Sequence, residues 1–299
     1  MTEKLTTRLR RLTSQPDACV MAPGAGDAFM ARMLARAGFE AVYMSGFATS
    51  VTRLGMSDVG LLTASEMLDN TWRIVDASGL PVLADIDTGY GNAMNVLRTV
   101  RDFEKAGAAA LHMEDQVSPK RCGHLAGKRV IPAAEMVSKI KAACDARVDA
   151  DLMLVIRTDA IAVEGIEAAF ERAERYREAG ADMLFIEAPV GREQTERVAR
   201  HFKGVPLLYN MAASGKSPDI PADELGRMGF RLATFALYGL LAAIAPIERM
   251  LGELRRTGTI GHLRDSMATF KHLNEIVGLP EHQAAEARYG VPEDEQTRL

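Results

Sequence analysis

Residues 178–187 read Glu-Ala-Gly-Ala-Asp-Met-Leu-Phe-Ile-Glu: the end of a helical pattern, a glycine, a short apolar run and an acidic residue. The same pattern recurs as Arg-Ala-Gly-Phe-Glu-Ala-Val-Tyr-Met-Ser at 36–45, as Lys-Ala-Gly-Ala-Ala-Ala-Leu-His-Met-Glu at 105–114, and more loosely at 227–235. Glycine at this place is typical of a residue that closes a helix in the left-handed conformation. The apolar runs are continuous, as in parallel strands that are buried on both faces. The repeat therefore indicates helices that alternate with buried parallel strands.

Further apolar runs bring the predicted strands to about eight, near residues 18–22, 40–44, 81–86, 109–113, 152–156, 182–186, 205–209 and 230–235. Helical patterns separate them, for example at 63–78, 92–106, 132–145, 166–179 and 192–201. Eight β/α units in 299 residues favour an α/β fold of the closed (β/α)8 TIM-barrel type over an open doubly wound sheet. No linker rich in Gly, Ser or Pro divides the chain. We therefore expect one domain over residues 1–299, with 236–299 as a helical C-terminal extension.

The composition excludes several classes of partner. The net charge is -4 and no long basic stripe compensates for it, which argues against nucleic acid. No uninterrupted apolar run reaches the length of a membrane span. The three cysteines are scattered, and the opening segment is charged and polar rather than apolar. We therefore expect a reduced, cytoplasmic protein that acts on a small molecule.

One basic loop, Lys-Arg-Cys-Gly-His-Leu-Ala-Gly-Lys, spans residues 120–128. Its thiol, Cys122, has cationic neighbours on both sides, which stabilise a thiolate and allow proton exchange near neutral pH. Gly123 and Gly127 give the loop the freedom to fold over a site and to open again. The structural alternative is a surface loop with an incidental cysteine. The polar residues at the predicted strand ends favour the functional interpretation.

Three carboxylates follow two of the predicted strands. Asp85 and Asp87 end one strand and Glu114 ends the next along the chain. Active-site residues of a β/α barrel lie at the carboxyl ends of the strands, so these side chains are expected to meet at one barrel mouth. Such an oxygen-rich cluster suits Mg²⁺, with Mn²⁺ as an alternative. The structural alternatives are turn chemistry for Asp87 and salt bridges or helix caps for the others.

Other strand ends carry groups that suit a carboxylate substrate. Arg157 offers a planar fork for a substrate carboxylate, and Glu187 and Asn210 are placed to orient the remaining oxygens. Asp159, two residues after the arginine, is open to interpretation as a helix cap or a salt-bridge partner. His112 lies inside an apolar run and is interpreted as a core histidine rather than a ligand.

Together these groups predict cleavage of a carbon–carbon bond beside a carbonyl group. A divalent metal and an arginine can hold an α-keto or α-hydroxy carboxylate and stabilise an enolate. Cys122 is the candidate acid that protonates the departing enolate, and Tyr43, at a strand end, is the candidate base or proton relay. The predicted reaction is a retro-aldol or retro-Claisen cleavage.

The residues quoted so far resemble the isocitrate lyase/phosphoenolpyruvate mutase superfamily, from about residue 23 to residue 235. The Cys-Gly-His loop resembles the lyase branch of that superfamily rather than its mutase and decarboxylase branches. The matching segments are PGAGDA (23–28), VYMSGF (42–47), DVGLLT (58–63), ADIDTGYGN (84–92), MEDQ (113–116), KRCGHLAGK (120–128), RTDA (157–160), FIEAP (185–189) and YNM (209–211).

The resemblance implies a Mg²⁺-dependent barrel, usually a homotetramer with C-terminal helices exchanged between neighbours. It implies that Asp85 binds the metal directly, with Asp87 and Glu114 close by through water, and that Cys122 is the catalytic thiol. It also implies contacts to substrate carboxylates from these positions: Ser45, Gly46, Gly123, His124, Arg157 and Asn210.

Three positions depart from the pattern of the family. Gly26 stands where the family usually has Tyr. Ala213 stands where a glutamate is expected after Asn210, and Phe47 stands where a small residue is common, which adds bulk near the substrate. We therefore expect a di- or tricarboxylate substrate of the methylisocitrate or 2-alkylmalate type, with a smaller 2-hydroxydicarboxylate preferred over methylisocitrate itself. The alternatives are oxaloacetate hydrolysis or decarboxylation, phosphonopyruvate chemistry, and a non-catalytic barrel that binds a carboxylate.

Overall fold

A computed structural model describes residues 3–123, 127–213 and 215–290 of the chain. His124, one of the predicted substrate contacts, lies outside the described residues. The chain divides into two compact units, residues 1–241 and 242–299. The prediction of a single domain with an extension from residue 236 stays a prediction.

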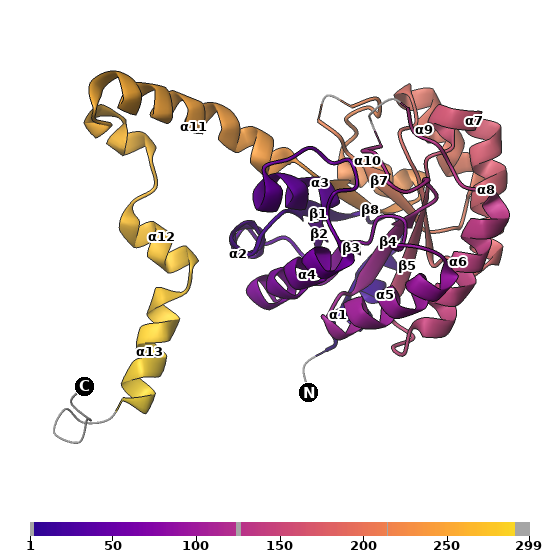
Figure 1. Cartoon of the computed structure of the whole chain (residues 1–299), viewed down its shortest axis with the longest axis horizontal. Coiled ribbons are helices and arrows are strands. Elements are labelled where there is room, and N and C mark those ends of the chain that lie inside the picture. The colour runs from indigo at the N-terminus through magenta and orange to yellow at the C-terminus, as the bar shows by residue number, and fades with distance from the viewer. Residues whose placement is uncertain (1–2, 124–126, 214, 291–299) are drawn as a thin grey trace. The chain divides into compact units, whose positions relative to one another are not determined.

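Eight parallel strands form a closed barrel in the order of the sequence, with β8 paired to β1 (Figure 1). This confirms the predicted (β/α)8 TIM-type architecture. The strands are β1 (Val20–Ala25), β2 (Val42–Met44), β3 (Val82–Asp85), β4 (Ala110–Glu114), β5 (Met153–Thr158), β6 (Met183–Ile186), β7 (Leu207–Asn210) and β8 (Phe230–Phe235).

Helices surround the strands in the first unit, and the five predicted helices are confirmed to within one residue at each end. The α-helices are α1 (Leu5–Thr13), α2 (Ala28–Arg36), α3 (Gly46–Thr49), α4 (Ala64–Ser78), α5 (Ala93–Lys105), α6 (Ala133–Ala146), α7 (Ile161–Glu164), α8 (Ile166–Glu178), α9 (Gly191–His201), α10 (Ala222–Met228), α11 (Tyr238–Thr257), α12 (Phe270–Ile276) and α13 (Leu279–Tyr289). A π-helical turn, η1 (Ser50–Leu54), follows α3, and a 3-10 helix, η2 (Gly261–Ser266), follows α11.

The glycines of the repeated pattern close helices, as the sequence indicates. Gly38, Gly107 and Gly180 follow α2, α5 and α8 and have φ angles of 86°, 89° and 117°, which an L side chain rarely adopts. The amino end of α4 is also determined by local sequence, because Thr63 and Glu66 form a reciprocal capping box there. Local sequence therefore sets where these helices begin and end.

Alternate residues of each strand point into the barrel, and their character changes along the strand. Near the amino ends they are apolar and form a small inner core, which includes Leu83 of β3 and Val155 of β5. Two residues further along the same strands are Asp85 and Arg157, which line a cavity. Side chains alternate between the two faces of a strand with a period of two. The inward-facing residues of one strand therefore belong to the inner core at its amino end and line the cavity at its carboxyl end. Leu9 of α1 packs against the inner core.

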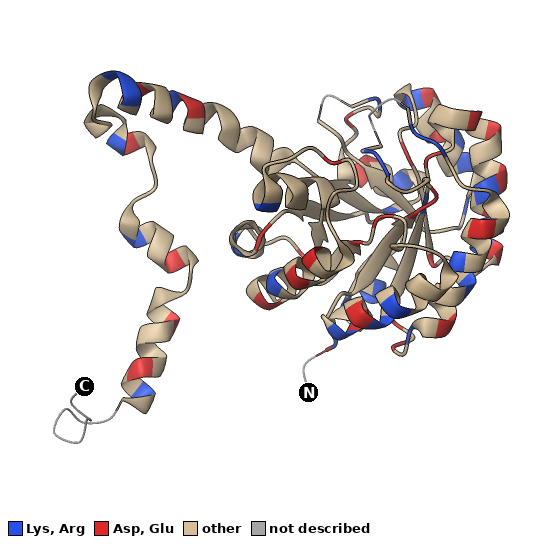
Figure 2. Cartoon of the chain, in the orientation of Figure 1, with Lys and Arg blue, Asp and Glu red and all other residues tan. Residues whose placement is uncertain are grey.

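A larger core lies between the strands and the helices around them, and it contains buried side chains such as Ile74 of α4, Phe103 of α5 and Tyr176 of α8. Charges of both signs are interspersed along the outer helices, and the strands are mostly uncharged (Figure 2). This arrangement agrees with the absence of a basic stripe in the sequence.

The strand ends differ slightly from the prediction. The ladder extends to Thr158 in β5 and to Asn210 in β7, beyond the apolar runs that predicted these strands. Glu114 of β4 pairs in register with Arg157, so polar residues at the mouth still take part in the sheet. The pattern of apolar residues under-predicts such ends because backbone hydrogen bonding does not depend on side-chain polarity.

The described part of the second unit is helical, which confirms the helical character predicted for the C-terminal extension. It contains the rest of α11, η2, α12 and α13. Several of its large apolar side chains are exposed, among them Ile244, Ile247 and Leu251. No helix in the described part of the chain is long and apolar enough to cross a bilayer.

Candidate active site

A cavity of about 210 Å³ opens at the carboxyl ends of the strands. This places the site at the end of the barrel where (β/α)8 enzymes carry their chemistry. Ten of the predicted site residues line it, namely Tyr43, Ser45, Phe47, Asp85, Glu114, Cys122, Gly123, Arg157, Glu187 and Asn210. The remaining described ones, Gly46 and Asp87, adjoin Asp85: Gly46 N–H donates to Oδ2 of Asp85 at 3.1 Å and Asp87 N–H to Oδ1 at 3.0 Å.

Asp85 is held by three hydrogen bonds. Besides the two backbone donors, its Oδ2 accepts a hydrogen bond of 3.2 Å from the hydroxyl of Tyr43. A Cβ at Gly46 would lie 2.7 Å from Oδ2, so only glycine allows the backbone to approach this closely. The carboxylate is thereby fixed in one orientation at the edge of the cavity.

Lys120 provides the cation of the carboxylate cluster. Its Nζ lies 2.6 Å from Oδ1 of Asp58 and 3.0 Å from Oδ1 of Asp87, and all three side chains are largely buried. Burial raises the pKa of Asp87 to about 6, and the nearby Lys120 ammonium works against this rise. From its place in the chain, Lys120 is predicted to be one of the cations that stabilise the Cys122 thiolate. In the structure its ammonium group instead binds the carboxylates of Asp58 and Asp87.

His112 and Tyr43 lie together beneath Asp85. The hydroxyl of Tyr43 is 3.3 Å from Nδ1 of His112, and that nitrogen is 3.6 Å from Oδ1 of Asp85. Burial lowers the pKa of His112 to about 4, so the ring is neutral at pH 7. Burial, with the adjacent charge of Asp85, raises the pKa of Tyr43 well above 10. The phenol is therefore protonated in the structure as it stands.

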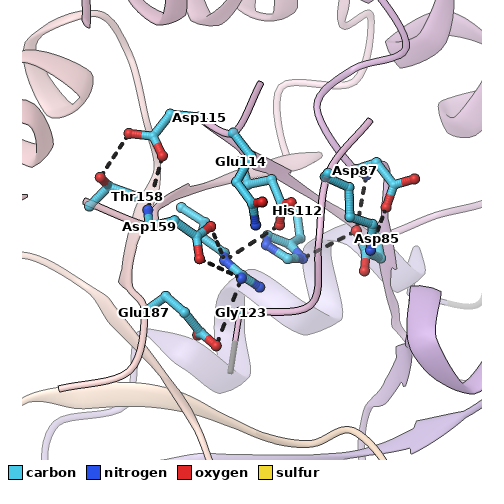
Figure 3. Close-up of polar contacts among 12 residues, drawn as sticks. Asp85, Asp87, His112, Glu114, Asp115, Gly123, Thr158, Asp159 and Glu187 are labelled. Atoms are coloured by element: carbon cyan, nitrogen blue, oxygen red, sulfur yellow. Dashed lines mark hydrogen bonds and ion pairs between the residues drawn. The ribbon is translucent and has the colours of Figure 1, made fainter. Parts of the chain in front are cut away.

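The carboxylate cluster fits a divalent cation of the Mg²⁺ type. Among the described residues no three His, Cys, Asp or Glu side chains converge tightly enough to form a complete metal cage. Mg²⁺ does not require such a cage, because it is commonly bound through one or two carboxylates, several waters and the substrate. In the described chain, Oε1 of Glu114 is buried without a hydrogen-bond donor (Figure 3), and burial raises the pKa of Glu114 well above its usual range. A bound cation would give Oε1 of Glu114 a partner and would lower the pKa of this carboxyl group.

Arg157 is held from one side by a carboxylate fork. Its Nε and Nη2 each donate to Asp159, at 2.9 Å to Oδ2 and 2.9 Å to Oδ1. Its Nε also lies 3.4 Å from Oε2 of Glu114, and its Nη2 lies 3.8 Å from Oε1 of Glu187. Because a bidentate pair sets both the plane and the position of a guanidinium, Arg157 is preorganised where it lines the cavity.

Asp159 itself is fixed by a second buried network (Figure 3). Its backbone N–H donates to Oδ1 of Asp115 at 2.9 Å. Asp115 Oδ2 accepts from the hydroxyls of Thr158, at 2.7 Å, and Tyr176, at 2.8 Å. Asp115 therefore supports the strand end rather than lining the cavity.

The remaining predicted polar residues are also held by hydrogen bonds. Asn210 donates from Nδ2 to Oε1 of Glu187 at 3.3 Å, and its Oδ1 accepts from the hydroxyl of Thr234 at 3.2 Å. Ser45 caps α3 through a bond of 3.2 Å from Ala48 N–H. Each of these side chains is oriented by a neighbour before any substrate arrives.

The cavity lining also includes apolar side chains, namely Phe47, Met211, Ala213, Ala236 and Leu237. Ala213, the position where the family pattern predicts a glutamate, therefore lines the cavity and adds no charge to it. The lining of the cavity thus combines charged and apolar side chains.

Two functional neighbours of the site, Asp58 and Lys128, are not among the residues that the sequence analysis predicts. Asp159 is a salt-bridge partner of Arg157, which is one of the two interpretations that the sequence leaves open. Asp159 follows Arg157 by two residues, so the period-two rule for strands places both side chains on one side. No local pattern points to Asp58, because it meets Lys120 from 62 residues away.

A family model described as phosphoenolpyruvate phosphomutase matches residues 9–255. The 2,3-dimethylmalate lyase of Eubacterium barkeri is 44% identical over 270 residues, covering 90% of this chain and 93% of that protein. The 2-methylisocitrate lyase of Bacillus subtilis (strain 168) is 41% identical over 282 residues, covering 94% of this chain and 92% of that protein.

Solved structures agree with these relatives. A crystal structure of 2,3-dimethylmalate lyase matches with a TM-score of 0.92 at 37% identity, over 100% of both chains. Oxaloacetate acetylhydrolase in complex with 3,3-difluorooxalacetate matches with a TM-score of 0.91 at 36% identity, over 96% and 98% of the two chains. Phosphonopyruvate hydrolase in complex with oxalate and Mg²⁺ matches with a TM-score of 0.85 at 28% identity, over 96% and 99%. The chain therefore belongs to the PEP mutase/isocitrate lyase superfamily, in its lyase branch, and is a carbon–carbon lyase.

Proposed function

We propose that this lyase cleaves a 2-alkyl-substituted 2-hydroxydicarboxylate of the 2,3-dimethylmalate type, with Mg²⁺ as its cofactor and Cys122 as the general acid. The observation that carries the proposal is the mixed lining of the cavity. Arg157 and Asp85 line it together with Phe47 and Leu237. A substrate that carries both carboxylates and alkyl groups matches both kinds of lining residue.

The apolar residues of the cavity lining also bear on the choice between a dimethylmalate lyase and a methylisocitrate lyase, the two kinds of lyase among the relatives. Methylisocitrate carries a third carboxylate, which needs a polar partner when it is buried. Phe47 and Ala213 offer none, whereas they suit the methyl groups of a dialkylmalate. This supports the dimethylmalate type over the methylisocitrate type.

The residues that would hold Mg²⁺ are Asp85 directly, with Asp87 and Glu114 through water. The fit of this cluster and the Mg²⁺ in the phosphonopyruvate hydrolase complex support the assignment. When bound, Mg²⁺ supplies a positive charge that polarises the substrate oxygens beside the bond to be broken. Arg157 holds a substrate carboxylate and keeps the reacting carbon in place.

The proton steps are assigned to Tyr43 and Cys122. Tyr43 is protonated and hydrogen-bonded to Asp85, and its hydroxyl lies 3.3 Å from Nδ1 of the neutral His112 ring. This favours a relay in which Tyr43 takes the substrate hydroxyl proton and passes its own to that nitrogen, rather than a standing phenolate base. As the hydroxyl loses its proton, the C2–C3 bond breaks and its electron pair goes to C3. Cys122 then gives its proton to C3. For 2,3-dimethylmalate the products are pyruvate and propionate, so the atoms balance.

A second candidate is hydrolysis of oxaloacetate to oxalate and acetate. The match to oxaloacetate acetylhydrolase over nearly the whole chain favours it. Hydrolysis needs a water molecule beside the substrate carbonyl. The apolar side chains of Phe47 and Leu237 in the cavity lining make the binding of that water less favourable. We therefore place it second.

The test is a product assay with Mg²⁺ on 2,3-dimethylmalate, citramalate, methylisocitrate, oxaloacetate and phosphonopyruvate, each repeated with EDTA. EDTA-sensitive release of pyruvate, with the highest kcat/KM on 2,3-dimethylmalate, is the expected result. Oxalate from oxaloacetate with no activity on the hydroxydiacids would move the assignment to the hydrolase. No turnover of any compound would leave a carboxylate-binding barrel.

We also propose that the protein is a homotetramer with exchanged C-terminal helices, as the family resemblance implies. The exposed apolar side chains of Ile244, Ile247 and Leu251 on α11 support a subunit contact there. Light scattering after size-exclusion chromatography tests this: a mass near four chains of 32.5 kDa is expected, and a monomer contradicts it.

A further inference from the structure

Lys128 is a buried lysine at the end of the basic loop, and the chemistry proposed above gives it no role. Its ammonium donates to the carbonyl oxygen of Gly123 and to Oδ1 of Asp159, which lies 2.7 Å away. The side chain of Lys128 is 2% exposed and that of Asp159 is 0%. Burial of an ammonium group is unfavourable unless it is paired, so these two contacts account for its position.

Asp159 connects Lys128 to the arginine of the cavity. Oδ1 of Asp159 accepts from Lys128 and also from Nη2 of Arg157, so one oxygen joins the two cations. Because Asp159 is fixed through its backbone to Asp115, it forms a rigid point between them.

Gly123 is the part of the loop that Lys128 holds. It lies directly beside Arg157 and Glu187, because a Cβ at this position would be less than 3.0 Å from Nη2 of Arg157 and from Oε1 of Glu187. Cys122 immediately precedes it and lines the same cavity. Cys122 is also held through its own N–H, which donates to the carbonyl oxygen of Asp58 at 3.2 Å. The Gly123 peptide is therefore one of two backbone anchors of the segment that carries the thiol.

We propose that Lys128 is a positioning residue that ties the Cys122–Gly123 segment to the Asp159–Arg157 pair. The bridge sets the distance between the thiol and the arginine-bound end of the substrate. Its catalytic consequence rests on the proposed function, since it presupposes Cys122 as the acid. The structural part, that Lys128 holds Cys122 in place, does not.

The kinetic test compares Lys128→Met with Arg129→Met. Both replace a cation by a flexible apolar chain of similar length, but Arg129 is exposed and the neighbouring Lys128 is buried. Loss of a hydrogen bond from a charged donor predicts a fall in kcat of about 10- to 100-fold in Lys128→Met, with KM changed less than about threefold. Arg129→Met is expected to match the wild type. An unchanged kcat in Lys128→Met overturns the catalytic part.

A labelling test separates the bridge from the proposed mechanism. The rate of alkylation of Cys122 by iodoacetamide, followed by peptide mass spectrometry, is expected to rise at least about threefold in Lys128→Met. Burial raises the pKa of Cys19 to about 12, so that thiol serves as an unreactive reference in the same sample. Unchanged labelling overturns the bridge whatever the activity. Two results together would support the bridge but contradict the acid role of Cys122. They are faster labelling of Cys122 in Lys128→Met and full activity in Cys122→Ser.

A second pair of variants tests the bridge in case Lys128→Met does not fold. If Lys128→Met gives no native circular dichroism spectrum, Lys128→Arg and Lys128→Gln are compared instead. Arginine keeps the positive charge toward Asp159 and is expected to retain the larger share of kcat and the slower labelling of Cys122. Equal values in the two variants contradict the bridge.

Discussion

Gly123 packs directly against Arg157, with no room between them for a side chain. A Cβ added at Gly123 would lie less than 3.0 Å from Nη2 of Arg157 and equally close to Glu187. The segment that carries the candidate acid therefore reaches the arginine that is expected to hold the substrate. This one contact links the basic loop, between β4 and β5, to the ends of β5 and β6.

The contact makes Gly123→Ala a sharp test of the site. The new methyl group must displace Arg157, Glu187 or the loop, so we expect kcat/KM to fall by roughly 100-fold or more, since misplacement of about 1 Å has that effect. Gly252→Ala is the matched control, because nothing lies within 4 Å of a Cβ built there. Steady-state kinetics check the result, and near-normal kcat/KM in Gly123→Ala would contradict the packing.

Cys122→Ser tests the general acid. Serine keeps the shape of the side chain, but its hydroxyl is a far weaker acid than a thiol. We expect kcat to fall by about 100-fold or more while KM stays within about threefold, since general acid catalysis contributes in this range. Cys144→Ser, on α6 and outside the cavity lining, is the control. Full turnover in Cys122→Ser would sink the acid assignment.

Metal removal has an expected signature that does not depend on turnover. After EDTA treatment and dialysis, added MgCl₂ should raise Tm by a few degrees, because a ligand that binds only the folded state stabilises it. Asp85→Ala should abolish this rise, whereas Asp145→Ala, an exposed carboxylate on α6, should retain it. Differential scanning fluorimetry measures both. The same Mg²⁺ shift in Asp85→Ala and in the wild type is the outcome that rejects Asp85 as a ligand.

The stability of the barrel in acid should depend on Asp159. Burial raises the pKa of this carboxyl, but the charges of Arg157 and Lys128 outweigh burial and hold the pKa well below its usual range. A pKa that is lower in the folded state stabilises the fold above the unfolded pKa of about 3.9, and this stabilisation is lost as the pH falls through the folded pKa.

Asp159→Asn should therefore unfold more easily than the wild type at pH 7, by about 3 kcal/mol, because it leaves two buried cations poorly compensated. This difference should shrink as the pH drops from 4 to 2. Urea unfolding followed by circular dichroism measures it, with Asp145→Asn as the exposed control. A difference that is constant from pH 7 to pH 2 would show that the charge of Asp159 is not the cause.

Phe47 is expected to set the size of the alkyl group that the cavity accepts. Phe47→Ala enlarges the apolar part of the cavity, so kcat/KM for 2,3-dimethylmalate should fall while that for a malate with a longer 2-alkyl chain should rise. One methylene in an apolar pocket is worth roughly 10-fold or more in discrimination. The ratio of the two kcat/KM values is the measurement. An unchanged ratio would place the alkyl group elsewhere.

The sequence by itself determined the barrel. Glycine-terminated helical patterns followed by continuous apolar runs predicted eight strands and five of the helices, because helix caps and buried parallel strands depend on short-range chemistry. The same periodicity put Asp85, Glu114 and Arg157 at strand ends, and closure of the barrel alone brings such ends together.

Only the tertiary structure decided how the charges are shared. Lys120, assigned by its neighbours in the chain to the thiol, is bound to Asp58 and Asp87 instead. Lys128 pairs with Asp159, 31 residues away in the chain, and Gly123 packs directly against Arg157. These partners come from different β/α units, so their pairing depends on the three-dimensional register of the barrel. A local pattern shows which groups are present, but a buried charge selects its partner by distance and by exclusion of water.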